Sequence, residues 1–166
     1  MKSRVDIPFV EVFEKVDNPS GYVEYRRITG KEVYRMDMEI TFPGGKKVDA
    51  HYDGFTVKTD QPVAEGGSGS APSPFDLFLA SIGTCTGYYV LSFCQKNNIP
   101  TENMRLIASI QRNPGTHLVE NIRIEIHVPK EFPEKYKNAV VKAADACAVK
   151  RHLNTPPKIH IIVASH

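Results

Sequence analysis

Apolar and polar residues alternate along residues 34–42, which read YRMDMEITF. Met36, Met38, Ile40 and Phe42 share one face of this segment, and a period of two is typical of a half-buried β-strand. The Pro-Gly-Gly sequence at 43–45 then predicts a turn. We interpret residues 47–58 as the return strand, so the N-terminal part of the chain is expected to contain a β-hairpin.

A long apolar helix is predicted after this β-rich region. Ser73 is a helix-capping residue, Pro74 suits the first helical position, and Asp76 lies three residues after the cap. The apolar pattern continues to Gln95 or Lys96, and Asp76 is the only charged residue before Lys96. A helix that is apolar almost all round is expected to be covered on every side. The preceding GGSGS sequence at 66–70 is interpreted as a flexible connection.

The remaining sequence predicts two strands, a second helix and a closing strand. The strands cover residues 103–112 and 119–128, the helix runs from about Pro133 to Leu153, and the last strand covers 158–163. Antiparallel hairpins combined with separate helices are typical of the α+β class.

We therefore expect residues 1–166 to form a single domain. It would consist of an N-terminal β region (1–65), the central helix (73–97) and a ββαβ region (103–166). One chain of this size offers only modest sheet surface to cover an apolar helix. We expect a second copy to supply the rest, in an intimate two-fold homodimer.

Three cysteines are the main candidates for chemistry. Cys85 lies between Gly83 and Gly87 in the central helix, where close packing of either another helix or a substrate would explain the two glycines. Cys94 lies nine residues later, roughly 180° around the helix and about 13 Å along its axis, so these two thiols are not expected to bond to each other. We interpret Cys94 as a small buried apolar side chain.

Cys147 is expected to point inward from the second helix. Tyr136, Val140, Ala144 and Cys147 fall on one apolar face of that helix. The geometry therefore permits either a Cys85–Cys147 or a Cys94–Cys147 pair. A thiolate that reduces an oxidant becomes a sulfenic acid, which a second thiol within reach converts to a disulfide.

Composition and charge exclude several classes of function. The net charge is +2, from 21 basic and 19 acidic residues that are interspersed, so a nucleic-acid or membrane partner is not indicated. The sequence shows no signal peptide or spanning segment, and we expect a cytoplasmic protein with free thiols. It contains no HExxH, CxxC or P-loop motif, so no metal or phosphate cofactor is expected. His152 leaves a cysteine–histidine hydrolase as a distant alternative.

The segment from Ala71 to Gly87, APSPFDLFLASIGTCTG, resembles the central-helix motif of the OsmC/Ohr superfamily. These are the osmotically inducible protein C and organic hydroperoxide resistance proteins. The loop that begins with Asp60-Gln61-Pro62 and the ACAVK sequence at 146–150 are similar to two further family motifs. The resemblance covers nearly the whole chain and implies antiparallel sheets wrapped around a long buried central helix, in an intertwined homodimer.

The resemblance also implies an activity. Cys85 would be the peroxidatic cysteine and Cys147 the resolving cysteine of a peroxidase that reduces small organic hydroperoxides in the oxidative stress response. A dithiol, such as a lipoyl group, would be the reductant, and no metal or bound cofactor would be needed. The site would lie at the dimer interface, where we expect Phe75, Tyr88 and Tyr89 to line an apolar pocket.

One departure from the family pattern affects this expectation. Phe75 stands where the peroxidase branches have a glutamate, and no motif identifies the arginine that accompanies it: Arg26, Arg27, Arg35 and Lys58 are all candidates. A fixed cation is a common reason for a low thiol pKa. The alternative hypothesis is therefore a non-catalytic dimeric module that binds a small apolar ligand.

Overall fold

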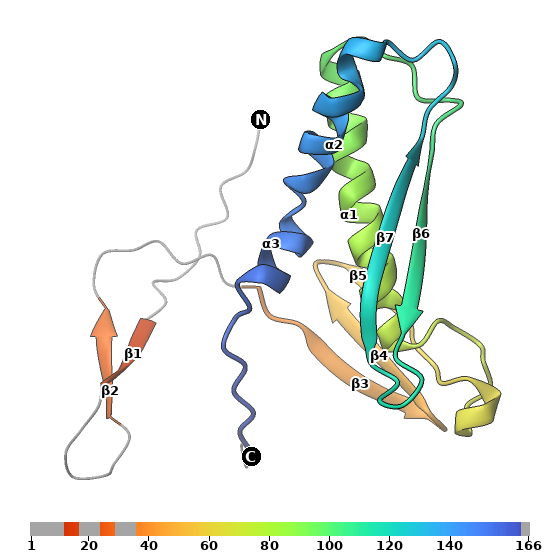
Figure 1. Cartoon of the computed structure of the whole chain (residues 1–166). Coiled ribbons are helices and arrows are strands. Elements are labelled where there is room, and N and C mark those ends of the chain that lie inside the picture. The colour runs from red at the N-terminus through yellow and green to blue at the C-terminus, as the bar shows by residue number, and fades with distance from the viewer. Residues whose placement is uncertain (1–11, 17–23, 29–35, 164–166) are drawn as a thin grey trace. The chain divides into compact units, whose positions relative to one another are not determined.

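The computed structural model describes residues 12–16, 24–28 and 36–163. They fall into two compact units, one ending at Thr59 and the other beginning at Asp60. Figure 1 shows the elements of each unit, and each unit is described by itself. Helices and antiparallel sheets are both present, so the predicted α+β class is confirmed.

The first unit contains two small antiparallel sheets. Strand β1 (Val12–Val16) pairs with β2 (Glu24–Ile28). The other sheet has the order β3 (Glu39–Gly44), β4 (Lys47–Tyr52) and β5 (Phe55–Val57).

The hairpin predicted around Pro43–Gly45 is present, but its return strand differs from the expectation. An Asp-Gly turn at 53–54 divides the segment 47–58 into β4 and β5. Asp53 and Gly54 both have positive φ, at 46° and 79°, and Asp-Gly is a favoured sequence for such two-residue turns. The first two residues of the predicted strand 34–42 lie outside the described residues, and Phe42 on its apolar face is 79% exposed.

The second unit begins with a loop that is organised by one carboxylate. Asp60 is 1% exposed, and its two oxygens accept hydrogen bonds from the N–H groups of Gln61, Ser68 and Ser70 and from both serine hydroxyls. These bonds hold the pKa of Asp60 far below its usual range, the Ser68 side chain having the largest effect. The GGSGS segment is therefore a tightly held loop rather than a simple connection.

Close packing inside this loop requires a glycine at position 67. A Cβ atom added there would lie 1.9 Å from the carbonyl oxygen of Gln61. This is much shorter than any van der Waals contact, and the neighbouring atom belongs to the backbone. The loop, which includes the short 3-10 helix η1 (Val63–Glu65), leads directly into the first α-helix.

Helix α1 (Pro74–Lys96) forms as predicted. The Ser73 hydroxyl accepts from the N–H of Asp76, and the Asp76 carboxylate accepts from the N–H of Ser73, which completes a capping box. Within the second unit the helix buries one stripe, formed by Ile82, Thr86, Val90 and Cys94. The described residues of this unit therefore do not cover it on every side, as the sequence led us to expect.

Two long strands follow α1. Strands β6 (Arg105–Arg112) and β7 (Val119–His127) pair antiparallel, and the Asn113 side chain closes their turn by accepting from the N–H groups of Gly115 and Thr116. The pairing of Leu106 with Ile126 places apolar side chains of both strands on one face. Figure 1 shows this hairpin running alongside α1.

The predicted second helix from Pro133 to Leu153 is wrong as a single element. It consists of a 3-10 turn, η2 (Glu134–Tyr136), and two separate helices, α2 (Lys137–Asp145) and α3 (Ala148–Asn154). Cys147 interrupts the helix because its backbone is extended, with φ −48° and ψ 125°. The apolar spacing that predicted one helix holds up to Ala144, and Cys147 is turned inward by the break.

The predicted closing strand at 158–163 is also not formed among the described residues. Ile159, Ile161, Ile162 and Val163 are all exposed. A strand needs the hydrogen-bonding groups of a neighbouring strand, and alternation in the sequence alone does not supply them.

The core of the second unit lies where α1, α2 and the two strands meet. Its buried members are Val90, Cys94, Ile99, Phe132 and Val140. Phe93 of α1 packs edge-to-face on Tyr136, with ring centroids 5.7 Å apart, which joins α1 to the start of α2. This packing fixes α2, and with it the position at which α3 begins.

The Asp60 carboxylate provides a test of the loop. We expect Asp60→Asn to lower the stability at pH 7, because a neutral amide cannot accept five hydrogen bonds. Since the pKa of Asp60 is depressed in the folded state, its contribution is complete above the unfolded pKa of about 3.9 and is lost as the pH falls through the folded pKa. Urea unfolding should therefore show a higher free energy of unfolding for the wild type than for Asp60→Asn. This difference should be constant from about pH 5 to 7 and should narrow below about pH 4. Asp53→Asn, in an exposed turn, is the control and should show no comparable loss.

Candidate active site

The structure brings Cys85 and Cys147 together from two different elements. Cys85 is half-buried in the middle of α1, and Cys147 is the residue that precedes the first turn of α3. Cys85 is among the groups that lower the pKa of the Cys147 thiol, so the two side chains are neighbours. Both are free thiols, so the site contains two neighbouring reduced sulfur atoms.

Cys94 lies apart from this pair. It is completely buried, and its thiol donates to the sulfur of Met104 at 3.8 Å. Burial raises the pKa of the Cys94 thiol. Its surroundings are those of a packing residue, as the sequence predicted.

The surroundings of Cys147 favour its thiolate. Burial by itself raises the pKa of this thiol, since the side chain is 0% exposed. Hydrogen bonding outweighs that effect and lowers the pKa overall: the donors are the N–H of Lys150, the side chains of Cys85 and Thr86, and the N–H of Val149.

Thr86 is a functional candidate that the sequence analysis missed. It is buried on α1, and its hydroxyl donates to the carbonyl oxygen of Ile82 at 2.8 Å while also lying within reach of Cys147. The sequence did contain one signal for this residue, because Thr86 is a polar residue next to Cys85 in an apolar helix. The position on the helix alone does not show which residue the hydroxyl contacts.

A cavity of about 390 Å³ lies in the second unit. Its apolar wall comes from α1, β7, α2 and α3, and its polar residues are Thr86, Asp145 and Lys150. Thr86 and Lys150 also act on the pKa of Cys147, although neither Cys85 nor Cys147 lines the cavity. The apolar residues of the wall include Ile82, Ile122, Ile124, Ile126, Val141 and Leu153.

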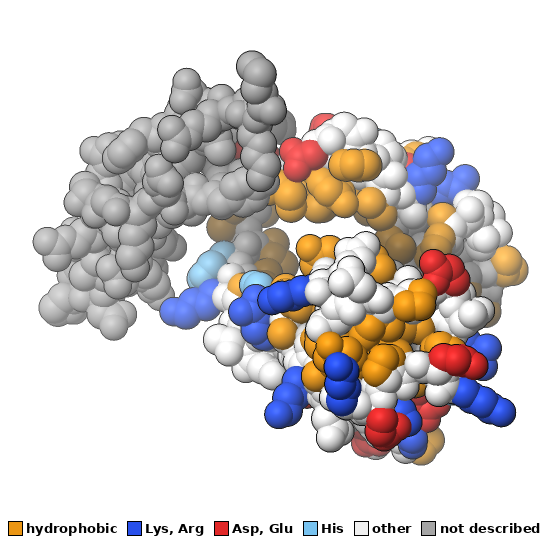
Figure 2. Space-filling model, turned by 90° about the horizontal axis from the view of Figure 1, so that it is seen from above, with side chains coloured by type: hydrophobic (Ala, Val, Ile, Leu, Met, Phe, Trp, Pro, Cys, Tyr) orange, Lys and Arg blue, Asp and Glu red, His pale blue; other side chains and the backbone are white. Residues whose placement is uncertain are grey.

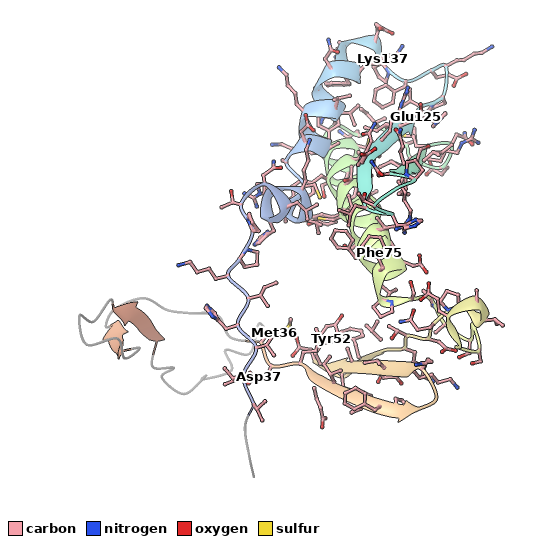
Figure 3. The ribbon with its side chains drawn as sticks, turned by 60° about the horizontal axis from the view of Figure 1, so that its bottom comes forward. Met36, Asp37, Tyr52, Phe75, Glu125 and Lys137 are labelled. Atoms are coloured by element: carbon pink, nitrogen blue, oxygen red, sulfur yellow. The ribbon has the colours of Figure 1, made fainter. Side chains whose placement is uncertain are left out.

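The three aromatic residues expected to line a pocket lie elsewhere on α1. Phe75 is in the first turn, where Figure 3 labels it, with its ring 5.5 Å from that of Phe78. Tyr88 is 64% exposed and meets the half-buried Tyr89 edge-to-face at 5.7 Å. None of the three contributes to the wall of the cavity described above. Their contact with a substrate stays a prediction.

The charged groups near α1 also differ from those that the sequence suggested. Arg112, from the end of β6, lies over the ring of Phe75 at 4.9 Å. Hydrogen bonds from Ser73 lower the pKa of Asp76, and the charge of Arg112 adds to this effect. A positive charge near the start of α1 is thus supplied by Arg112, which sequence reasoning did not single out because it lies on a strand, 38 residues after Pro74.

The four cations named from the sequence stay unassigned. Arg26, Arg27 and Lys58 belong to the first unit, and Arg35 lies outside the described residues. Lys150 is the cation of α3 nearest to Cys147 in sequence, and its ammonium is paired with Asp145 at 2.5 Å. All four groups that favour the Cys147 thiolate are uncharged.

The remaining candidates for chemistry are not assembled into a site. The Nδ1 atom of His152 lies 2.8 Å from the carbonyl oxygen of Ala148, on an exposed part of α3. Among the residues that the structure describes, no group of three or more histidine, cysteine, aspartate or glutamate side chains is placed to hold a metal ion.

Comparison with known proteins identifies the family of this chain. The model of the OsmC-like protein family matches residues 67–162, which is more than half of the chain and includes both Cys85 and Cys147. The chain therefore belongs to the OsmC-like family. A search of curated protein sequences gives no match.

Solved structures share the fold at low sequence identity. An osmotic stress induced and detoxification response protein from Psychrobacter arcticus is 20% identical, with a TM-score of 0.61 over 75% of this chain and 90% of that chain. An OsmC like protein from Mycoplasma pneumoniae is 16% identical, with a TM-score of 0.56 over 74% and 89%. An organic hydroperoxide resistance protein from Elizabethkingia anophelis is 19% identical, with a TM-score of 0.51 over 76% and 93%.

The lowered pKa of Cys147 can be measured directly. We expect the thiolate absorbance near 240 nm to appear below the usual cysteine pKa of about 8.5 and to be lost in Cys147→Ser. Cys94→Ser is the control and should retain it. Because the folded pKa is lower than the unfolded one, the thiolate contributes stability above about pH 8.5, and this is lost as the pH falls through the folded value. A low-pH transition that persists in Cys147→Ser would contradict the assignment.

Proposed function

We propose that this chain is a thiol-dependent peroxidase that reduces small organic hydroperoxides through Cys85 and Cys147. The observation that supports the proposal is that the two thiols are neighbours, although they come from α1 and from the start of α3. Two neighbouring thiols can form a disulfide, and this is the step that follows oxidation of one of them.

The apolar cavity supports an organic substrate. Its wall consists mainly of isoleucine, valine and leucine side chains, and two of its polar residues, Thr86 and Lys150, act on the pKa of Cys147. An alkyl or aryl hydroperoxide could place its apolar part against such a wall, whereas hydrogen peroxide would gain nothing there. The name of the Elizabethkingia anophelis protein, which shares the fold, refers to organic hydroperoxides.

In the proposed cycle Cys85 is the nucleophile, because it is the more accessible of the two sulfurs. It attacks the hydroperoxide, releases the alcohol and becomes a sulfenic acid. Cys147 then attacks that sulfur, releases water and forms the Cys85–Cys147 disulfide. A dithiol, such as a lipoyl group, would restore both thiols by exchange. We propose no resident metal or cofactor, and a reducing cytoplasm would suit the resting thiols.

We also propose that the chain acts as a homodimer. Hydrophobic side chains reach its surface (Figure 2), and on α1 the uncovered face includes Ala80, Tyr88 and Leu91. A Cβ atom added at Gly83 or Gly87 would meet nothing within 4 Å in this chain, so a second helix could approach α1 closely there. By length and composition α1 is also apolar enough to cross a membrane. Its contacts with α2 and α3 favour a protein partner.

A second candidate function is a dimeric module that binds a small apolar ligand without catalysis. The cavity favours this function as well, because its wall could hold a ligand whether or not Cys85 reacts. The two candidates differ in the fate of the thiols, which decides between them.

The peroxidase proposal predicts a specific disulfide. Reduced protein treated with cumene hydroperoxide should form Cys85–Cys147 rapidly, and more slowly with hydrogen peroxide, as mapped by mass spectrometry. Cys85→Ser should abolish peroxide consumption. Cys147→Ser should consume no more than one equivalent of cumene hydroperoxide in the presence of a dithiol, since it cannot form the disulfide that completes the cycle.

Cys94→Ser is the matched control for these variants. It removes a thiol from the same helix as Cys85, and it should retain turnover. If Cys85 stays reduced for minutes in excess cumene hydroperoxide, the peroxidase proposal fails and the ligand-binding module remains.

The dimer proposal predicts that a charge on the uncovered face of α1 prevents association. Ala80→Arg should convert a dimer to a monomer in light scattering, because a guanidinium would have to be buried between the two helices. Gln95→Arg, beside Lys96 at the exposed end of the same helix, should remain dimeric. A monomeric mass for the wild-type chain would contradict the proposal.

A further inference from the structure

An ion pair spans the break between α2 and α3. Asp145 is the last residue of α2 and Lys150 is the third residue of α3, and the Nζ atom of Lys150 lies 2.5 Å from Oδ1 of Asp145. Cys147 is the N-cap residue of α3 and lies between the two charged residues in the sequence. The pair therefore joins the two sides of the break that contains the buried cysteine of the candidate site.

Close packing does not explain how α3 keeps its place. The helix has seven residues, all of which the structure describes, and none of them is buried. An isolated helix of that length is not stable in water, so α3 depends on its contacts with the rest of the chain. Its residues Lys150 and Leu153 line the cavity of about 390 Å³, so on that side α3 faces open space and not a packed core.

The position of Cys147 depends on both helices. Its carbonyl oxygen accepts from the N–H of Arg151 at 3.0 Å, in the first turn of α3. Its own N–H donates to the carbonyl oxygen of Ala144 at 3.2 Å, in the last turn of α2. The place of the Cys147 sulfur is thus set by the orientation of α3 relative to α2, and a contact that fixes this orientation also fixes the sulfur.

We propose that Asp145 and Lys150 are positioning residues, which hold α3 against α2 so that Cys147 lies where it can form a disulfide with Cys85. This inference rests on the proposed function, in which the disulfide completes the oxidation of the two thiols. In that step the Cys147 sulfur attacks the sulfur of the Cys85 sulfenic acid, the S–S bond forms and the S–O bond breaks. The oxygen leaves as water with the thiol proton, and neither positioning residue gains or loses a proton.

The expected effect of the ion pair is modest and depends on salt. The side chains of Lys150 and Asp145 are 51% and 62% exposed. An exposed ion pair changes an equilibrium up to about fivefold. Dissolved ions screen such a pair, and at about 1 M salt the Debye length falls to about 3 Å. A positioning role therefore predicts a small loss of disulfide in variants that lack one charge, and salt should reproduce this loss in the wild-type chain.

The test measures the equilibrium between the full-length chain and glutathione, without peroxide. The Cys85–Cys147 disulfide is quantified by mass spectrometry after acid quenching, and its equilibrium constant with glutathione is compared among variants. Asp145→Asn and Lys150→Met should each lower the constant about two- to fivefold. The double variant should lower it no further, because both changes remove the same interaction. Exchange of the two charges, in Asp145→Lys with Lys150→Asp, should restore the constant.

Salt provides a second measurement on the same equilibrium. The ratio of the wild-type constant to the Asp145→Asn constant is followed, because salt effects on glutathione itself cancel in this ratio. It should fall to about one as the salt concentration is raised to about 1 M. A ratio that does not change with salt, or equal constants for all variants, would overturn the inference.

Glu134→Gln is the matched control. Glu134 pairs with Lys137 at 2.6 Å at the beginning of α2, and both of these side chains are also exposed. The substitution removes one exposed ion pair from the same helix without affecting the break at Cys147, so it should leave the constant unchanged. An equal loss in Glu134→Gln would assign the effect to the stability of α2, and the inference would fail.

The reaction with peroxide separates this inference from the proposed function. With cumene hydroperoxide, Asp145→Asn should form the Cys85 sulfenic acid at the wild-type rate, as measured by trapping with dimedone, and close the disulfide about two- to fivefold more slowly. If peroxide is consumed but the glutathione equilibrium is the same in all variants, the inference fails while the peroxidase stands. If the glutathione equilibrium shows the loss but Cys85 does not react with peroxide, the peroxidase fails while the positioning of Cys147 stands. Absence of the disulfide with both oxidants contradicts both.

Discussion

The architecture of the second unit depends on one stripe of α1. Ile82, Thr86, Val90 and Cys94 recur every four residues and form the side of the helix that the rest of the unit covers. The C-terminal part of this stripe, Val90 and Cys94, packs with Ile99, Phe132 and Val140, and this packing positions α2. Thr86 is the one member with a hydroxyl, and it is also the one that reaches the second cysteine. The same stripe therefore supports the fold and enters the candidate site.

The sequence predicted this helix well because its signals are local. Ser73, Pro74 and Asp76 form a complete start signal, and the apolar run ends at Lys96. The β6–β7 hairpin could be predicted equally well, because the alternation of apolar and polar residues and the Asn-Pro-Gly turn lie within a few residues of each other. Features that depend on distant parts of the chain were not predictable in this way. The meeting of Arg112 with Phe75 depends on how a strand end lies against a helix start.

The site shows the same division between local and distant information. Helical geometry separated Cys85 from Cys94 correctly, and the structure places Cys94 in the core beside Met104. The approach of Cys147 to Cys85 was one of two pairings that the sequence left open. Its donors could not be foreseen, because they arise from a break in the helix at Cys147 that the apolar spacing conceals. Likewise, the serines that surround Asp60 looked like a loose linker until their shared acceptor was visible.

The break at Cys147 also has a mechanical consequence. In one continuous helix, any displacement of Cys147 would be transmitted through the backbone hydrogen bonds to Val140 and the core. Here α2 ends at Asp145 and α3 starts at Ala148, so Cys147 lies between the two helices and belongs to neither. In the proposed function Cys147 changes its covalent partner at this break, outside the packing of α2 against α1.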